Sequence, residues 1–247
     1  MRSGPVVVAH RGTSAVRPEN TLAAFECAKA MGAKGIEFDV QATADGALVV
    51  HHDYRLDRTT SGSGLVFERD LSYVRSLDAG SWFGAAFGGE RVPLLDEVLA
   101  IDDLEFELEL KGFGAQLLTD VLAAVRAFGA LRRTEFTSWN IPMLLALKDR
   151  CPEARLGLFS RRQEGWMLDQ VFERTVMSAV PFGAFDVVHV YAADVTSSLV
   201  DLIHDCGLVA HANDAAHSAE IHSALEAGVD RVSTNDVELA VGVLGED

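Results

Sequence analysis

The sequence predicts a single-domain α/β barrel over residues 1–247. Apolar runs alternate with helical-period segments along the chain, which is typical of parallel strands joined by helices. Eight such units with no strand left over favour closure of the sheet, and 247 residues suit one closed barrel. We therefore expect a TIM (β/α)8 barrel. A doubly wound open sheet is the alternative, which the lack of a glycine-rich dinucleotide motif after the first strand disfavours.

Each predicted strand is a short run rich in Val, Ile, Leu or Phe. The eight runs are 6–10, 35–40, 104–111, 134–139, 155–160, 185–191, 208–213 and 230–235. The helical segments are 21–31, 94–100, 117–128, 142–150, 168–180, 198–206, 219–227 and 237–244. Gly32, Gly129, Gly207 and Gly228 each follow a helix, where a left-handed residue commonly ends it.

One long irregular stretch, residues 54–92, interrupts this alternation. Loops of this length are usually functional or disordered, and the aromatic residues favour an ordered segment. These aromatic residues are Phe67, Tyr73, Trp82, Phe83 and Phe87. We expect a flap over the barrel mouth, with a surface decoration as the alternative.

Composition limits the class of protein. Hydrophobic residues make up 49% and charged residues 23%, as in folded globular chains. The net charge of −16 argues against nucleic acid or an anionic membrane as a general partner. No apolar run is long enough for a signal peptide or a membrane span, so we expect no stable membrane insertion. Cys27, Cys151 and Cys206 lack metal-type spacing, which predicts buried, reduced thiols and a cytoplasmic location.

Carboxylates follow the inward face of two predicted strands. In 35–40, Glu37 and Asp39 share one face, opposite an apolar face that meets the helices. In 104–111, the inward positions are Glu105, Glu107, Glu109 and Lys111. Parallel strands covered on both sides are usually apolar throughout, so this alternation is unexpected.

Buried carboxylates at this density are costly unless a cation lies among them. Glu37, Asp39 and Glu109, near the carboxyl ends of their strands, offer oxygen ligands suited to one Mg²⁺ or Ca²⁺ ion. The alternative is a charged barrel interior neutralised by Lys111 and Arg11 alone.

Two adjacent histidines follow the Asp45-Gly46 turn. A two-residue hairpin at this turn would pair Asp39 with His52 and Val40 with His51. His52 is therefore predicted to face the carboxylates, unless a bulge shifts the register by one residue. His10 and Arg11 end the first strand at the same rim, where barrel enzymes build their sites.

These groups suit a phosphoryl substrate. A metal and Arg11 would neutralise phosphate oxygens, Lys111 could add a positive charge, and the two histidines could exchange protons with the attacking and leaving oxygens. His189 and His211 are further candidates for the barrel rim, without an assigned role.

The motifs, in their order, resemble the glycerophosphodiester phosphodiesterase family. The N-terminal signature includes His-Arg-Gly, Pro-Glu-Asn-Thr, Glu-x-Asp-Val, Asp-Gly and His-Asp, and "LDAGSWFGAAFGGERVPLLDEVL" and "ELELK" continue it over about the first 111 residues. The resemblance implies a TIM barrel that uses a divalent cation to hydrolyse glycerophosphodiesters to glycerol 3-phosphate and an alcohol.

The resemblance also implies roles for matching residues. His10 and His52 correspond to the acid–base pair, and Arg11 and Lys111 to phosphate contacts. The implied metal ligands are Glu37, Asp39 and Glu109.

The C-terminal half departs from the family pattern. Ala210 stands where many members have Trp, which removes an aromatic wall near the expected glycerol position, and Asn235 stands where Asp is usual. A lysophospholipid headgroup hydrolase therefore remains an alternative within enzymes. A non-catalytic barrel that binds a phosphate ester is the alternative outside them.

Overall fold

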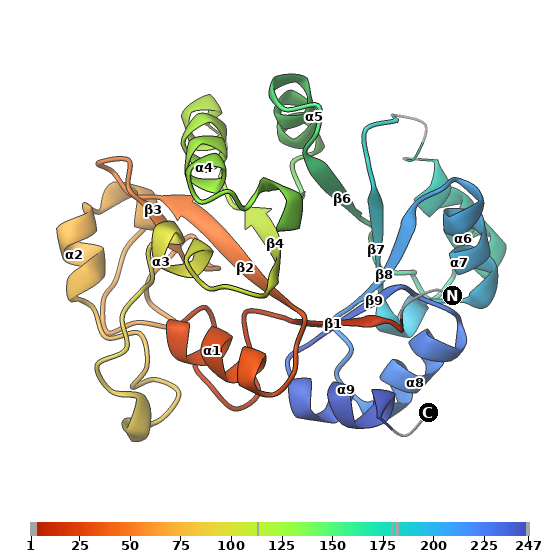
Figure 1. Ribbon diagram of the computed structural model, residues 1–247, viewed down its shortest axis with the longest axis horizontal. Coiled ribbons are helices and arrows are strands. Elements are labelled where there is room, and N and C mark those ends of the chain that lie inside the picture. The colour runs from red at the N-terminus through yellow and green to blue at the C-terminus, as the bar shows by residue number, and fades with distance from the viewer. Residues whose placement is uncertain (1–3, 113, 179, 181–182, 246–247) are drawn as a thin grey trace.

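A closed barrel of eight parallel strands forms the centre of the protein, with helices around it (Figure 1). The computed structural model describes residues 4–112, 114–178, 180 and 183–245. The sheet order is β1-β9-β8-β7-β6-β5-β4-β2-β3, and pairing of β1 with β2 closes the barrel. The predicted TIM barrel is thereby confirmed.

The strands and helices follow the predicted alternation. The strands are β1 (Val6–Ala9), β2 (Gly35–Ala42), β3 (Leu48–Val50), β4 (Glu105–Leu110), β5 (Thr134–Thr137), β6 (Arg155–Phe159), β7 (Val187–Tyr191), β8 (Val209–Asn213) and β9 (Arg231–Thr234). The helices are α1 (Leu22–Ala30), α2 (Leu71–Ser76), α3 (Leu95–Leu99), α4 (Ala115–Ala127), α5 (Ile141–Arg150), α6 (Asp169–Met177), α7 (Ser197–Asp205), α8 (Ser218–Glu226) and α9 (Val237–Leu244). Part of the predicted helix 168–180, Ala179, lies outside the described residues.

Strands β2 and β4 turn their acidic residues into the barrel. They pair in parallel with Glu37 opposite Glu107 and Asp39 opposite Glu109, so the acids of both strands share a face. The opposite face is apolar: Phe38 packs edge-on against Phe106, with ring centroids 5.6 Å apart. The predicted inward position of the carboxylates is confirmed.

The predicted register of the β2–β3 hairpin is wrong by one residue. Val40 pairs with Val50 and Ala42 with Leu48, so Asp39 lies opposite His51 instead of His52. The loop between Thr43 and Ala47 has three residues and not two. Gly46 has a φ of +84° but Asp45 has no positive φ, which fits a three-residue loop and not a type I′ turn of Asp45 and Gly46. The extra residue moves every cross-strand pair by one position.

The long segment after β3 is ordered, but it lies beside the barrel. Figure 1 shows α2 and its neighbouring loops on the outer side of β3. This segment has a small core of its own, which includes Leu56, Val66, Val74 and Val92. Only its first residues, 52–55, line the cavities at the mouth described below. The expected aromatic flap over the mouth is therefore corrected to a side extension.

The three cysteines are all free thiols, but only Cys151 is buried; Cys27 is half-buried and Cys206 exposed. The prediction that all three are buried is thus wrong for two of them. Among the helices of the described residues, none is both long and apolar enough to cross a membrane.

Candidate active site

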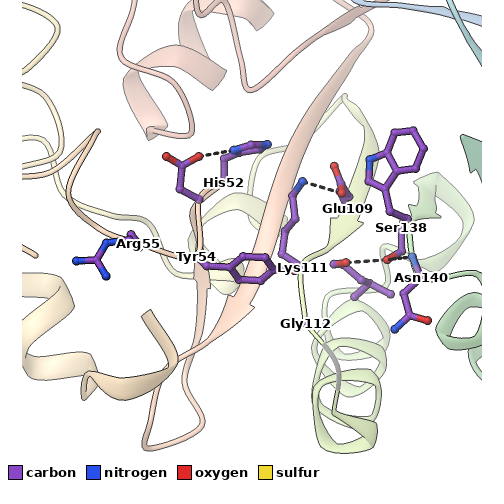
Figure 2. Close-up of a pocket in the computed structure, with 11 residues that line it drawn as sticks. His52, Tyr54, Arg55, Glu109, Lys111, Gly112, Ser138 and Asn140 are labelled. Carbon is purple, nitrogen blue, oxygen red and sulfur yellow. Dashed lines mark hydrogen bonds and ion pairs between the residues drawn. The ribbon is translucent and has the colours of Figure 1, made fainter. Parts of the chain in front are cut away.

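The candidate site lies at the carboxyl ends of the barrel strands. A cavity of about 620 Å³ is bounded by His52 on one side and by Glu109 and Lys111 on another (Figure 2). A smaller cavity of about 160 Å³ adjoins it through shared residues and also reaches His10 and Glu37. The structure thus brings together residues from β1, β2, β4 and the segment after β3.

Glu37, Asp39 and Glu109 form a compact acidic cluster. One carboxylate oxygen from each lies within 4.8 Å of the others, and all three side chains are buried. Lys111 Nζ lies 2.7 Å from Glu109 Oε1 and 3.3 Å from Asp39 Oδ1. The sequence placed these four residues together, and the structure agrees.

The pKa shifts in this cluster reflect burial and mutual repulsion. Burial, with the charges of Asp39 and Glu107, raises the pKa of Glu37 well above its ordinary value. Burial and Asp39 likewise raise the pKa of Glu109 to about 7. Burial opposes ionisation of Asp39 too, but Lys111 and other positive neighbours hold its pKa below the ordinary value. The cluster therefore favours an added positive charge.

The positively charged side chains nearby do not pair with all three carboxylates of the cluster. No Lys or Arg side chain forms an ion pair with Glu37 in the described part of the chain; its Oε2 accepts the backbone N–H of Arg11 at 2.9 Å. Asp39 Oδ1 is buried and accepts no hydrogen bond. Three carboxylates whose negative charge is only partly compensated fit a divalent ion such as Mg²⁺ or Ca²⁺. This arrangement disfavours the alternative in which Lys111 and Arg11 alone neutralise the cluster.

Arg11 and Gly12 shape the turn after β1. Arg11 has a φ of +54°, a strained conformation for a residue with a side chain, and Gly12 has a φ of +81°. A Cβ on Gly12 would lie 2.6 Å from Ala24 Cβ, so only glycine fits there. The turn aims the Arg11 N–H at Glu37, while Arg11 NH1 donates to Glu19 Oε1 at 2.9 Å.

His10 lies between the acidic cluster and the end of β9. Its Nδ1 is 2.8 Å from Asn235 Oδ1 and its Nε2 is 3.8 Å from Glu37 Oε2. The hydroxyl of Ser14 lies 2.8 Å from the same Asn235 Oδ1 and 2.9 Å from the carbonyl oxygen of His10. With Asn235 Oδ1 as the acceptor, neutral His10 carries its proton on Nδ1. Burial lowers the pKa of the ring.

His52 lines both cavities, whereas His51 lines neither of them. His52 Nδ1 is 2.6 Å from Asp53 Oδ1, and His51 Nε2 is 3.1 Å from the carbonyl oxygen of Arg55. The chain leaves β3 after Val50, and this bend brings His52 to the mouth despite the shifted register. His52 thus lies at the cavities with the carboxylates, but the hairpin register used to predict this position is wrong.

Sequence reasoning gave no role to several residues that hold the site together. Asn20 Nδ2 donates to Asp39 Oδ2 at 2.8 Å, and Arg58 bonds both Glu19 and Asp53. A chain of ion pairs therefore connects the two sides of the site. It runs from Arg11 through Glu19, Arg58 and Asp53 to His52. In the sequence, Glu19 and Asn20 were visible as part of the Pro-Glu-Asn-Thr motif, and Asp53 as the acidic residue directly after His52. Nothing in the sequence pointed to Arg58.

The chain resembles known proteins along most of its length. A sequence family described as "Glycerophosphoryl diester phosphodiesterase family" matches residues 10–239. A glycerophosphodiester phosphodiesterase from Caldanaerobacter subterraneus subsp. tengcongensis is 34% identical over 248 residues, covering 97% of both chains.

Solved structures of similar chains share the fold. One is a putative glycerophosphoryl diester phosphodiesterase from Silicibacter pomeroyi, with a TM-score of 0.87 and 28% identity, covering 100% of this chain and 95% of that one. Another is an Oleispira antarctica phosphodiesterase in complex with the product sn-glycerol-3-phosphate, with a TM-score of 0.85 and 25% identity, covering 98% of this chain and 97% of that one.

Proposed function

The chain belongs to the glycerophosphoryl diester phosphodiesterase family, and from that premise we propose that it hydrolyses glycerophosphodiesters to glycerol 3-phosphate and an alcohol. The observation that carries the proposal is the meeting of His10 and His52 with a three-carboxylate cluster at one cavity. The relative from Oleispira antarctica, solved with sn-glycerol-3-phosphate, supports the same product for this chain.

Glu37, Asp39 and Glu109 would hold one divalent cation, Mg²⁺ or Ca²⁺. When bound, this ion would neutralise negative charge on the phosphate oxygens. Lys111 would add a second positive charge beside the same phosphate. Arg11 lines the smaller cavity, and its guanidinium, with Nε 3.7 Å from Asp39 Oδ2, would bring a further positive charge close to the phosphate.

His10 is proposed as the general base. Its Nδ1 faces Asn235, which leaves Nε2 to take a proton from the water molecule that attacks the phosphorus atom. Because burial lowers the pKa of His10, the ring is neutral and ready to accept that proton near pH 7.

His52 is proposed as the general acid. Its Nδ1 faces Asp53, which fixes the ring and leaves Nε2 to give a proton to the oxygen of the departing alcohol. The two rings then return to their starting states by exchanging protons with solvent.

A direct assay tests the proposal. We expect release of glycerol 3-phosphate from glycerophosphocholine, loss of that activity with EDTA, and recovery with Mg²⁺ or Ca²⁺. His10→Ala and His52→Ala should each reduce turnover by about 100- to 10,000-fold. His222→Ala, which changes an exposed histidine on α8, is the control. Activity that persists after full removal of metal would reject the metal site, and phosphate-ester binding without turnover under any divalent ion would favour a non-catalytic barrel.

A lysophospholipid is the second candidate substrate, favoured by one observation. An apolar cavity of about 330 Å³ between β6 and α6 shares Phe159 with the smaller cavity at the mouth. An acyl chain could lie against Met167 and Phe172 in that cavity. A higher kcat/KM for lysophosphatidylcholine than for glycerophosphocholine, lost in Phe172→Arg, would support this substrate. A small glycerophosphodiester in the cytoplasm remains our primary expectation.

A further inference from the structure

A second group of metal-ligating side chains lies in the barrel interior, outside the acidic cluster at the mouth. Glu107 on β4, His189 on β7 and His211 on β8 are 3%, 0% and 1% exposed. One ligand atom from each residue lies within 4.8 Å of the other two. None of these residues has a role in the proposed reaction.

Three polar atoms of this group, on Glu107 and His211, lack hydrogen-bond partners among the described residues. In the described part of the chain, neither ring nitrogen of His211 makes a hydrogen bond, and Glu107 Oε2 accepts none. Leaving a buried polar group unsatisfied costs about 1–3 kcal/mol. A ligand that all three side chains could share would remove this cost.

The distances suit a shared metal ion. His211 Nδ1 is 3.5 Å from Glu107 Oε2, and His189 Nδ1 is 3.5 Å from Glu107 Oε1. These separations are long for hydrogen bonds. Ligand atoms about 2.0–2.1 Å from a tetrahedral Zn²⁺ lie about 3.3–3.4 Å from each other.

His189 already has the orientation of a metal ligand. Its Nε2 lies 2.5 Å from Glu135 Oε1, so the ring donates to a buried carboxylate on one side and turns Nδ1 toward Glu107 on the other. Metal-binding histidines usually make such a bond with their second nitrogen. Asn213 Oδ1 lies 3.0 Å from His189 Nδ1 and is a further oxygen atom that could bind the metal. The proton on His189 Nδ1 would be released when the metal binds.

Gly157 on β6 allows His189 and Glu135 to pair, and a cavity gives a route to Glu107. A Cβ at Gly157 would lie 2.5 Å from both Glu135 Oε1 and His189 Nε2, so only glycine leaves room for that pair. The smaller cavity at the mouth is lined by both Glu107 and Asn213, so an ion could enter from the same side as the substrate.

We propose that Glu107, His189 and His211 form a second metal site, which takes a first-row transition ion such as Zn²⁺. Two imidazoles with one carboxylate favour such ions, whereas three carboxylates favour Mg²⁺ or Ca²⁺. The two sites would therefore select different ions by their donor atoms. This proposal does not depend on the reaction proposed above.

Metal titration of the whole chain tests the second site. Metal-free protein is first given excess Mg²⁺ to fill the carboxylate cluster, and Zn²⁺ or Co²⁺ is then added. We expect one equivalent to bind in the presence of Mg²⁺, with the visible absorption of four-coordinate Co²⁺ and a higher unfolding temperature. Failure to bind any equivalent of Zn²⁺ or Co²⁺ under these conditions would overturn the proposal.

Variants test whether the bound Zn²⁺ ion is held by Glu107 and His211. His211→Gln and Glu107→Gln should each weaken Zn²⁺ binding by about 100-fold or more. Glu109→Gln, which alters the cluster at the mouth, and His222→Ala should both retain the Mg²⁺-resistant equivalent. Native affinity in His211→Gln would refute the assignment.

A spectroscopic measurement on the native chain covers the case in which these variants do not fold. X-ray absorption of the Zn²⁺-loaded protein should show two imidazole ligands, and loading Mg²⁺ first should not change this result. A coordination shell made only of oxygen atoms would contradict the proposal.

Discussion

The mouth and the interior of the barrel both contain charged side chains, but the two regions satisfy them differently. At the mouth, Asp39 and Glu109 are held by Asn20 and Lys111 and still lack enough positive charge. In the interior, Glu135 is paired with His189 and lies 3.6 Å from Arg231. Glu135 thus has positive partners inside the protein, whereas Glu109 lines both cavities at the mouth, where a ligand can reach it.

The pKa values of the two regions follow the same division. Burial and Asp39 raise the pKa of Glu109 at the mouth to about 7. Burial opposes ionisation of Glu135 as well, but His189 and the nearby arginines lower its pKa to about 2. Charge on Glu135 is already compensated within the protein, whereas charge on Glu109 favours an added cation.

Glu109→Gln should have the largest effect on activity and a small effect on stability. Removal of one carboxylate weakens the cation site and the placement of Lys111, so we expect kcat/KM to fall by about 1,000-fold, or about 4 kcal/mol. Steady-state assays and thermal unfolding measure the two effects. A large loss of stability with normal activity in the folded protein would break the contrast between mouth and interior.

Glu135→Gln should act in the opposite way, by lowering the free energy of unfolding. The change removes one partner of a buried ion pair, which costs about 3–5 kcal/mol. Glu105→Gln is a matched control, because Glu105 contacts the same Arg231 at 2.9 Å but its side chain is 45% exposed. We expect it to cost less than about 1 kcal/mol. Equal losses in urea denaturation would show that burial does not separate the two carboxylates.

Arg58→Ala should have a smaller effect, confined to the mouth. Arg58 donates to Asp53 from Nε at 2.7 Å, and Asp53 positions His52. Without this support we expect kcat to fall about 10-fold, or about 1.4 kcal/mol, with KM and the unfolding temperature little changed. Arg69→Ala, an exposed arginine of the same segment that lines neither cavity at the mouth, is the control. A loss that appears only in KM would show that Arg58 binds substrate and does not position His52.

The pH dependence should show the smallest effect. The proposed base must be unprotonated, and burial lowers the pKa of His10 below its ordinary value of 6.5. With the divalent ion at saturating concentration, which keeps Glu37 and Glu109 ionised, activity should therefore be present at pH 7 and fall as the pH drops through that lowered pKa. We expect the acid limb of the kcat/KM profile to lie below pH 6.5 and to change in Asn235→Ala. An acid limb above pH 7 would contradict the assignment of His10 as the base.

The sequence by itself determined the barrel and the acidic face of its strands. Alternation of side chains along a strand is a local property, so Glu37, Asp39 and Glu109 could be placed inside from the chain order alone. The motifs identified His10, Arg11 and the family in the same way. These features depend on residues near each other in sequence.

Only the tertiary structure decided the register of the hairpin, the bend that presents His52, and the partners that hold the site. Arg58 and Glu19 are 39 positions apart, and His189 and Glu135 are 54 apart. Their contacts exist because barrel closure and the side extension bring distant segments together. A single residue more in the loop after Thr43 shifted the strand pairing, since the side-chain period of two makes register sensitive to each insertion.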